Sequence, residues 1–459
     1  MTERTHDTWT QSDRYVPTRF LRPLLKFTRV EAGSGIVLLL AAAAALAWAN
    51  APFGEGYETF WTSPIDLDFG ILHIEETLRD VVNDALMAIF FFVVGLEIKR
   101  ELVRGDLADR KRAMLPIVAA LGGMIFPAAI YLIIASGGDA SRGWGIPMAT
   151  DIAFSIGIVA LLGTRIPVGA RLFLLALAIV DDIGAIAVIA IFYTDDLQFA
   201  WLAVGLGTLV AIRIATKVGV RNVTFYVLLG SFTWLCFLES GVHATIAGVA
   251  LGLMTPAVAL YSDAEYKRRA TLVLSRFEME AHAPRGPERV DADALELAAI
   301  ARESVSPLDR LEVAIHPWSS FLIVPIFALA NAGVRFAGLD VVDAATSSVA
   351  LGVALGLIVG KTVGVTLFAY LAVRLGMGSL PRNTTWRHIV GLAIIAGVGF
   401  TVSLFIAELA FFDPELLDLA KIGIFTGSGV AGISGYLYLR GSGSKTPTPE
   451  LAGALDVAD

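Results

Sequence analysis

The stretch Leu174–Ile186, LLALAIVDDIGAI, places two adjacent aspartates in the middle of an apolar run that extends over residues 168–193. A helix needs about 20 apolar residues to cross the hydrocarbon core of a bilayer, and similar runs recur from Ile36 to Tyr438. The 459-residue chain is 56% hydrophobic and only 17% charged, with a mean hydropathy of +0.70. Soluble domains are about 25% charged. The pattern predicts an all-α polytopic membrane protein, because a β-barrel would need short alternating strands.

The apolar runs predict twelve transmembrane helices. They lie near residues 32–50, 79–99, 113–136, 145–163, 168–193, 198–216, 222–238, 242–259, 314–334, 347–373, 387–411 and 416–439. If the N-terminus is inside, 30 of the 35 Lys and Arg residues fall in cytoplasmic segments and four fall outside. The remaining one, Lys361, lies within the tenth span. This asymmetry follows the positive-inside rule and predicts that both termini are cytoplasmic.

The start of the chain has a second interpretation. The run Ile36–Trp48, followed by Ala49–Ala51, resembles a secretory signal peptide with its cleavage site. The charged segment in front of this run is unusually long for a signal peptide, and cleavage would leave eleven spans. We therefore interpret the run as the first span.

Several segments are predicted to lie outside the membrane. They are a basic cytoplasmic segment (1–30), a charged cytoplasmic insert (261–310) within the twelve-span domain 31–440, and a flexible cytoplasmic tail (441–459). The insert contains a helix-compatible stretch at Ala264–Glu280, whereas the tail has no apolar face to bury.

The outer segment Pro64–Ile74 shows a strand pattern. Apolar and acidic residues alternate over Ile65–Phe69, and Gly70 is suited to a turn into a second strand. We expect a hairpin whose free edge pairs with a second copy of the chain to form a homodimer.

Ionisable residues within the spans are the first candidates for chemistry, because such groups are costly in lipid. Asp181 and Asp182 lie about 20 Å along their helix from its cytoplasmic start. Successive helical residues point about 100° apart, so the two carboxylates face different surroundings. Either of them could instead form a structural ion pair with a neighbouring helix.

Two spans carry the signs of an interrupted helix. Span four contains Pro147 and the pair Thr150–Asp151, and span eleven contains the small-residue run Ala396–Ser403. Interruptions at matching positions of two halves indicate an inverted-repeat transporter with its site at the breaks. The opposed helix ends then need a carboxylate near the N-terminal ends and a cation near the C-terminal ends. Asp151 and Lys361 are the candidates, although the glycines of span eleven alone could reflect helix packing.

Seven ordered motifs resemble the NhaA family of sodium/proton antiporters over about Glu31–Arg440. They are Phe90–Leu102 (FFFVVGLEIKREL), Ala149–Phe154 (ATDIAF), Val180–Ala185 (VDDIGA), Ser240–Thr245 (SGVHAT), Phe327–Gly333 (FALANAG), Gly360–Lys361 and Gly399–Thr401 (GFT). The resemblance implies a transporter, not an enzyme, in the bacterial inner membrane. It would export Na⁺ or Li⁺ in exchange for H⁺, electrogenically and under pH regulation.

The resemblance also implies roles for residues. Asp181 and Asp182 would exchange protons and, with Thr150, bind Na⁺ or Li⁺, and Lys361 would pair with Asp181 when no cation is bound. Asp151 and Thr150 would lie at the crossing of the broken helices, with the second break at Gly399, Phe400 and Thr401. Positions associated with an ion funnel and pH regulation are Asp84, Glu97, Glu101, His243, Glu312 and His316.

Two departures from the family pattern concern regulation. Val313 follows Glu312 where a second histidine is usual, and residues 261–310 replace a much shorter connection. The regulatory positions also have plainer explanations: interfacial histidines often only form hydrogen bonds, and Glu97 and Glu101 could belong to a solvated helix end.

Other classes of function fit less well. An intramembrane aspartyl protease would carry Tyr-Asp and Gly-x-Gly-Asp motifs, which are absent from the sequence. Gly432–Gly435 matches the Gly-x-Ser-Gly string of a rhomboid-like protease, but it lies at the end of the last span without a neighbouring histidine. The single cysteine, Cys236, excludes a disulfide framework.

A bile-acid-type sodium symporter is the nearest transporter alternative. We expect no cofactor and no nucleic-acid partner, only the bilayer and the transported ions.

Overall fold

The computed structural model describes residues 31–68, 73–194, 197–220, 222–280, 287–336 and 340–442. The predicted N-terminal segment 1–30 and residues 443–459 of the predicted tail lie outside this part. The chain forms two compact units. The first comprises residues up to 87, 106–194 and 320 onward, and the second comprises 88–105 and 195–319.

The first unit is mostly helical, with one two-stranded sheet. Its elements are α2 (Glu31–Ala49), α3 (Glu55–Trp61), β1 (Pro64–Asp68), β2 (His73–Thr77), α4 (Leu78–Val81), the π-helical η3 (Val82–Leu86), η4 (Asp106–Ala108), α6 (Arg110–Ile134), the 3₁₀-helical η5 (Gly138–Met148), α7 (Ile152–Leu161), η6 (Gly163–Arg165), α8 (Val168–Phe192), α15 (Val324–Asn331), α16 (Val341–Thr346), α17 (Ser348–Leu355), the π-helical η8 (Gly356–Gly360), α18 (Lys361–Arg374), α19 (Trp386–Ile395), α20 (Phe400–Ala410) and α21 (Pro414–Ser442).

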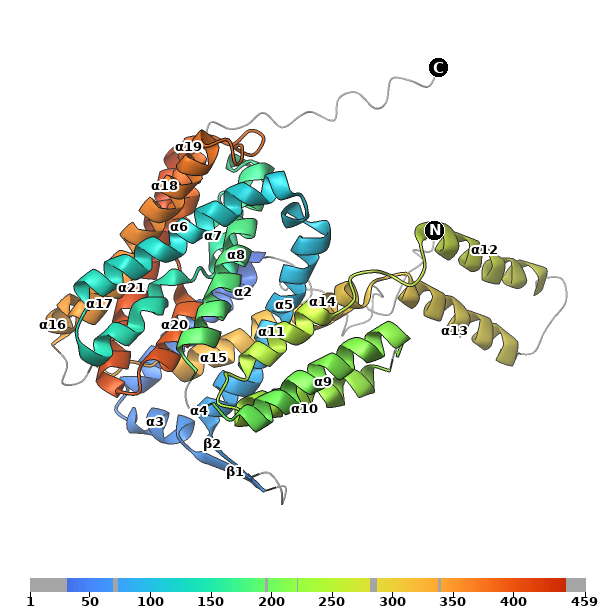
Figure 1. Ribbon diagram of the computed structural model, residues 1–459, viewed down its shortest axis with the longest axis horizontal. Coiled ribbons are helices and arrows are strands. Elements are labelled where there is room, and N and C mark those ends of the chain that lie inside the picture. The colour runs from blue at the N-terminus through green and yellow to red at the C-terminus, as the bar shows by residue number, and fades with distance from the viewer. Residues whose placement is uncertain are drawn as a thin grey trace, which may run out of the picture. The chain divides into compact units, whose positions relative to one another are not determined.

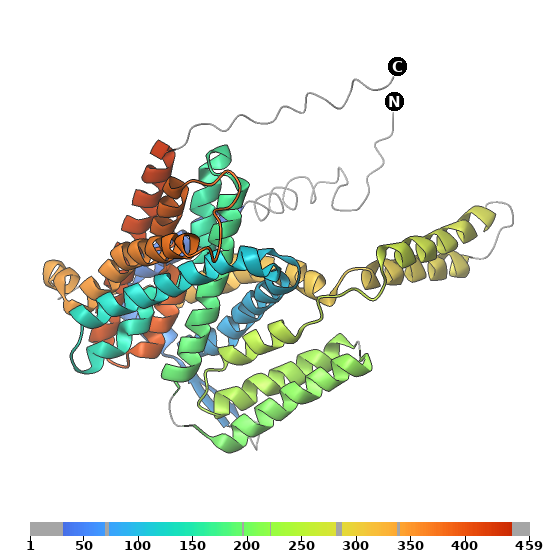
Figure 2. The ribbon, with the colours of Figure 1, turned by 45° about the horizontal axis from the view of Figure 1, so that its top comes forward.

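The second unit is helical throughout its described residues. Its elements are α5 (Met87–Arg104, whose first residue belongs to the first unit), α9 (Phe199–Val218), α10 (Val223–Glu239), α11 (Thr245–Met254), α12 (Asp263–Glu280), α13 (Pro287–Glu303) and α14 (Pro307–Trp318); the π-helical η7 (Ser319–Ile323) leads back to the first unit. Helices α9 and α10 lie side by side in both views (Figures 1 and 2). Leu209, Phe237 and Ala247 form a buried core in this unit.

Seven helical segments in the described part of the chain are long and apolar enough to cross a membrane, or up to nine if each of two bent helix pairs forms one span. The bent pairs are η5 with α7, at 44°, and α19 with α20, at 45°. Three further apolar helices are shorter: Gly33–Ala49, α10 and α11. The chain is therefore a multi-pass membrane protein.

The helical structure in predicted span four begins earlier in the chain than the apolar pattern does. We predicted a start at residue 145, but η5 begins at Gly138 and continues through Pro147 to Met148. The polar start of η5 escapes a hydropathy pattern, and its backbone is held by two buried tyrosines of the first unit. Tyr131 donates to the Ala140 carbonyl at 2.7 Å, and Tyr193 donates to the Arg142 carbonyl at 2.7 Å.

Close packing of α6 against α18 depends on glycine. A Cβ atom at Gly364 would lie 2.1 Å from the Gly122 carbonyl oxygen, and one at Gly122 would lie 2.2 Å from the Gly364 oxygen. The backbones are thus in direct contact, as small residues allow in membrane helices.

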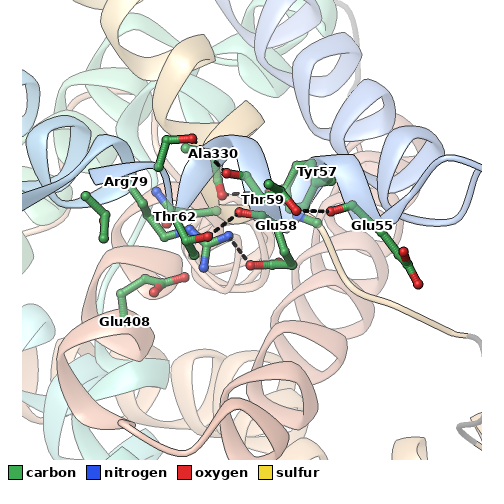
Figure 3. Close-up of polar contacts among 12 residues, drawn as sticks. Glu55, Tyr57, Glu58, Thr59, Thr62, Arg79, Ala330 and Glu408 are labelled. Carbon is green, nitrogen blue, oxygen red and sulfur yellow. Dashed lines mark hydrogen bonds and ion pairs between the residues drawn. The ribbon is translucent and has the colours of Figure 1, made fainter. Parts of the chain in front are cut away.

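The predicted outer hairpin is present. β1 pairs antiparallel with β2, with Ile65 opposite Glu76; the turn at 69–72 lies outside the described residues. Beside it, Tyr57 of α3 is 1% exposed and donates to the Ala330 carbonyl at 2.7 Å (Figure 3). Burial raises the pKa of this phenol above its usual value.

The insert forms a helical hairpin. The helix predicted at Ala264–Glu280 is confirmed as α12, and α12 packs against α13 (Figure 2). Arg276 of α12 forms ion pairs with Asp293 at 3.1 Å and with Glu296 at 2.9 Å.

Candidate ion-binding site

The two bent helix pairs are joined by hydrogen bonds to backbone carbonyl groups. Asp151 N–H, at the bend between η5 and α7, donates to the Val398 carbonyl at 2.7 Å. In return, the hydroxyl of Ser403 in α20 donates to the Ile146 carbonyl of η5 at 2.7 Å. Backbone groups that a bend frees inside a membrane protein must find new partners. Here each bend supplies partners for the other, so the bends are fixed together.

Asp151 lies at the N-terminal ends of two helices. One carboxylate oxygen caps its own helix α7, accepting from Phe154 N–H at 3.0 Å. The other oxygen accepts from both the backbone N–H of Thr401, at 3.1 Å, and its hydroxyl, at 2.6 Å. Helix N-termini carry partial positive charge. A single carboxylate, 2% exposed, therefore compensates both α7 and α20.

The carbonyl end of α19 is satisfied by hydroxyl groups. Thr150 lies 2.8 Å from the Ala396 carbonyl oxygen, and Ser155 donates to the Ile395 carbonyl at 3.3 Å. We expected Lys361 near such C-terminal ends; it pairs with Asp181 Oδ2, the oxygen that the Thr150 hydroxyl also contacts. These hydroxyls donate hydrogen bonds to carbonyl oxygens that the end of a helix leaves without intrahelical partners.

Asp181 and Lys361 form a buried ion pair. Lys361 Nζ lies 2.5 Å from Asp181 Oδ2, and both side chains are 0% exposed. The Thr150 hydroxyl lies 2.7 Å from the same oxygen, so its single proton is shared between this carboxylate and the Ala396 carbonyl. Gly123 of α6 packs beside the pair: a Cβ there would lie 2.8 Å from Val365 Cγ2, but at the ordinary contact distance of 3.7 Å from Asp181 Oδ1.

Lys361 follows a π-helical segment, η8. Such segments are rare and frequently occur at functional sites. Asp182, the next residue after Asp181 on α8, is 4% exposed. It points about 100° away from Asp181 around the helix axis, so the two carboxylates have different neighbours.

This arrangement offers oxygen ligands to a small hard cation. Carboxylate, hydroxyl and carbonyl oxygens suit such ions. No group of three or more His, Cys, Asp and Glu side chains converges among the described residues. A cation at Asp181 and Asp182 would therefore need Thr150 or backbone carbonyls to complete its shell.

Only some regulatory candidates come together. In the second unit, His316 Nε2 lies 3.8 Å from Glu97 Oε1, and Arg100 forms an ion pair with Glu312. Glu101 lies one turn beyond Glu97 on the same helix. His243 of the same unit lies in the loop before α11, and Asp84 belongs to η3 in the first unit.

The sequence interpretation missed several residues that hold this site. They are Ser155, Ser403, Ser428, Gly122, Gly123, Gly364, Tyr131 and Tyr193. The spacing Gly360-x₃-Gly364 was an available signal for close helix packing. The serines gave none, because Ser and Thr are common in membrane helices.

Buried ionisable groups at the crossing of two bent helix pairs define an ion-coupled membrane transporter. The sequence matches the family described as Na⁺/H⁺ antiporter 1 over residues 25–439, and the chain belongs to this family.

The sequences of curated relatives align with nearly the whole chain. The chain is 43% identical to Na⁺/H⁺ antiporter NhaA 2 of Sorangium cellulosum, over 92% of this chain and 90% of the relative. It is 44% identical to Na⁺/H⁺ antiporter NhaA of Oleidesulfovibrio alaskensis (92% and 94% covered) and 46% identical to NhaA 3 of Frankia alni (92% and 89% covered).

Proposed function

We propose that the protein exports Na⁺ or Li⁺ in exchange for H⁺, as a secondary transporter without enzymatic activity or a cofactor. The observation that carries this proposal is the buried pair of Lys361 and Asp181, with the Thr150 hydroxyl on the same carboxylate oxygen. A cation that binds at Asp181 Oδ2 competes with the ammonium group of Lys361 for this oxygen. Cation and protonated amine thus compete for one site, which is the requirement for exchange.

Two carboxylates support an electrogenic cycle. If Asp181 and Asp182 together take up protons on one side and a single cation on the other, more than one proton enters for each Na⁺ that leaves. Proton competition also makes the cycle depend on pH. The cluster of Glu97, Glu312 and His316 in the second unit is our candidate for additional pH regulation.

We propose a twelve-span architecture with inverted repeats. It takes the two bent pairs as discontinuous spans four and eleven, and it adds Gly33–Ala49, α10 and α11 to the seven long helices. The asymmetry of Lys and Arg supports an inner-membrane orientation with both termini in the cytoplasm. The outer hairpin β1–β2 has a free edge that suits a homodimer.

The decisive experiment is ΔpH-driven exchange in proteoliposomes with Na⁺, Li⁺ or K⁺, from mildly acidic to alkaline pH. We expect Na⁺ and Li⁺ to dissipate the pH gradient without any organic substrate, which also distinguishes the antiporter from a bile-acid-type symporter. No response to any of the three cations would defeat the proposal.

A further inference from the structure

A second group of buried charges lies at the outer end of α20 in the first unit. Glu408 of α20 forms an ion pair with Lys421 of α21 at 2.9 Å, and their side chains are 11% and 4% exposed. The carboxylate of Glu408 also points toward Arg79 of α4, which in turn donates to Glu58 of α3 at 2.9 Å (Figure 3). Glu408 is thus held between two cationic side chains.

The other end of α20 is also attached to α21. The backbone N–H groups of Gly399 and Phe400 both donate to the hydroxyl of Ser428, at 3.3 Å each. These N–H groups belong to the free end of the half-helix, where no preceding turn accepts them. α21 therefore contacts α20 at the bend and again near its outer end.

The spacing of these contacts is similar on both helices. Glu408 lies eight residues after Phe400 on α20, and Ser428 lies seven residues after Lys421 on α21. Both spacings are about two helical turns, or roughly 11 Å along the helix axis. The two contacts thus fix an antiparallel register between α20 and α21.

The register of α20 against α21 determines where the hydrogen-bond donors of Thr401 lie relative to Asp151. Thr401, at the start of α20, gives two hydrogen bonds to Asp151. The bend after α19 interrupts the helical hydrogen bonds between α19 and α20, so the position of α20 along its axis is not fixed by α19. Contacts with other helices must therefore fix the position of Thr401 relative to Asp151.

We infer that Glu408 is a positioning residue for the ion site: its pair with Lys421, together with the Ser428 contact, sets the depth of Thr401 against Asp151. This inference rests on the proposed antiport. Glu408 itself is two turns from the bend and does not bind the transported cation.

The test measures the apparent KM for Na⁺ in proteoliposomes, the maximal rate and thermal stability for each variant. Glu408→Gln should raise KM about fivefold to tenfold, in keeping with the weakening of one charge-assisted hydrogen bond at Asp151. Lys421→Met should act in the same direction, and the double variant should show less than the product of the two effects. Glu415→Gln is the matched control, since Glu415 is exposed in the first turn of α21.

The possible outcomes separate the two proposals. A wild-type protein without any cation response refutes the antiport itself. An active wild type with an unchanged KM in Glu408→Gln, even with lowered stability, makes the pair merely structural and overturns the inference. If Glu408→Gln does not fold, Ser428→Ala carries the test, because loss of the second contact must also raise KM. Glu408→Asp, which keeps the charge, should recover part of the affinity.

Discussion

Lys361 and Asp181 are 180 residues apart in the sequence, yet Nζ and Oδ2 lie 2.5 Å from one another with both side chains fully buried. The pair joins α18 to α8 in the first unit. An isolated charge is costly in such a place, and a pair repays this cost only with good geometry. The Thr150 hydroxyl improves that geometry on the carboxylate side.

Removing one partner of this pair should destabilise the protein. We expect Lys361→Ala to lower the free energy of unfolding by about 3–5 kcal/mol, because it leaves Asp181 buried without its counter-charge. Asp181→Asn should cost less on its own, and combining the two should recover part of the loss. A detergent-based unfolding series measures this cycle. Strictly additive losses would show that the two groups are not energetically coupled.

The neighbouring carboxylate is expected to be indispensable for exchange. Asp182→Asn should abolish Na⁺-dependent proton movement in proteoliposomes, because an amide can neither release a proton nor compensate a cation. Asp139→Asn, in the first turn of η5, is the control and should keep normal turnover. Normal Na⁺-dependent turnover in Asp182→Asn would assign that residue a structural role.

Tyr57 should stabilise the outer segment in a pH-dependent way. Its hydroxyl donates to Ala330 and accepts from Gly333 N–H at 3.1 Å, and burial raises its pKa. The raised pKa means that the folded state binds the phenolic proton more tightly. Stability from this group is therefore complete below the unfolded pKa of about 10 and falls as the pH rises above it.

The matching variant is Tyr57→Phe. It should lower the free energy of unfolding by about 1–3 kcal/mol at neutral pH, since buried backbone groups lose their partner. It should also flatten the loss of stability at strongly alkaline pH. Equal alkaline slopes for the two proteins would contradict the assignment.

Much of this arrangement is encoded in local patterns. Apolar length predicts the long spans, the alternation at Ile65–Phe69 predicts the β1–β2 hairpin, and equal depth in the membrane predicts that Lys361 can reach Asp181. The depth of a residue in the membrane can be predicted from the sequence because a helix rises by a constant distance for each residue.

The neighbour that each side chain faces around its helix cannot be predicted in the same way. Lys421 counts as one of four outside charges in the sequence, yet it is 3% exposed and pairs with Glu408. The hydroxyls of Thr150, Ser155 and Ser403 meet carbonyls more than 200 residues away. The π-helical segment before Lys361 was not predicted from the sequence.

The outer hairpin should contribute to assembly. β1 and β2 pair only with one another in the described part of the chain, which leaves an edge available to a second copy. Deleting Pro64–Ile74 should weaken a dimer on sizing in detergent, while exchange remains largely intact because the ion site lies elsewhere in the first unit. The same oligomeric state before and after deletion would count against this role.

Backbone contact between α6 and α18 should be as important for transport as the charges themselves. Gly364 lies three residues after Lys361, and a Cβ atom at this position would lie 2.1 Å from the Gly122 carbonyl oxygen. Backbone cannot move aside as a flexible side chain can, so Gly364→Ala must push α18 away from α6. Lys361 would then withdraw from Asp181, and we expect exchange to fall by at least about tenfold, since about 1.4 kcal/mol of lost interaction suffices for that factor. Gly207→Ala in α9 is the control: a Cβ there has nothing within 4 Å, so activity should be unchanged. Parallel measurement of exchange and thermal stability in both variants decides the matter, and equal activity of the two would show that α6 and α18 can separate without disturbing the pair.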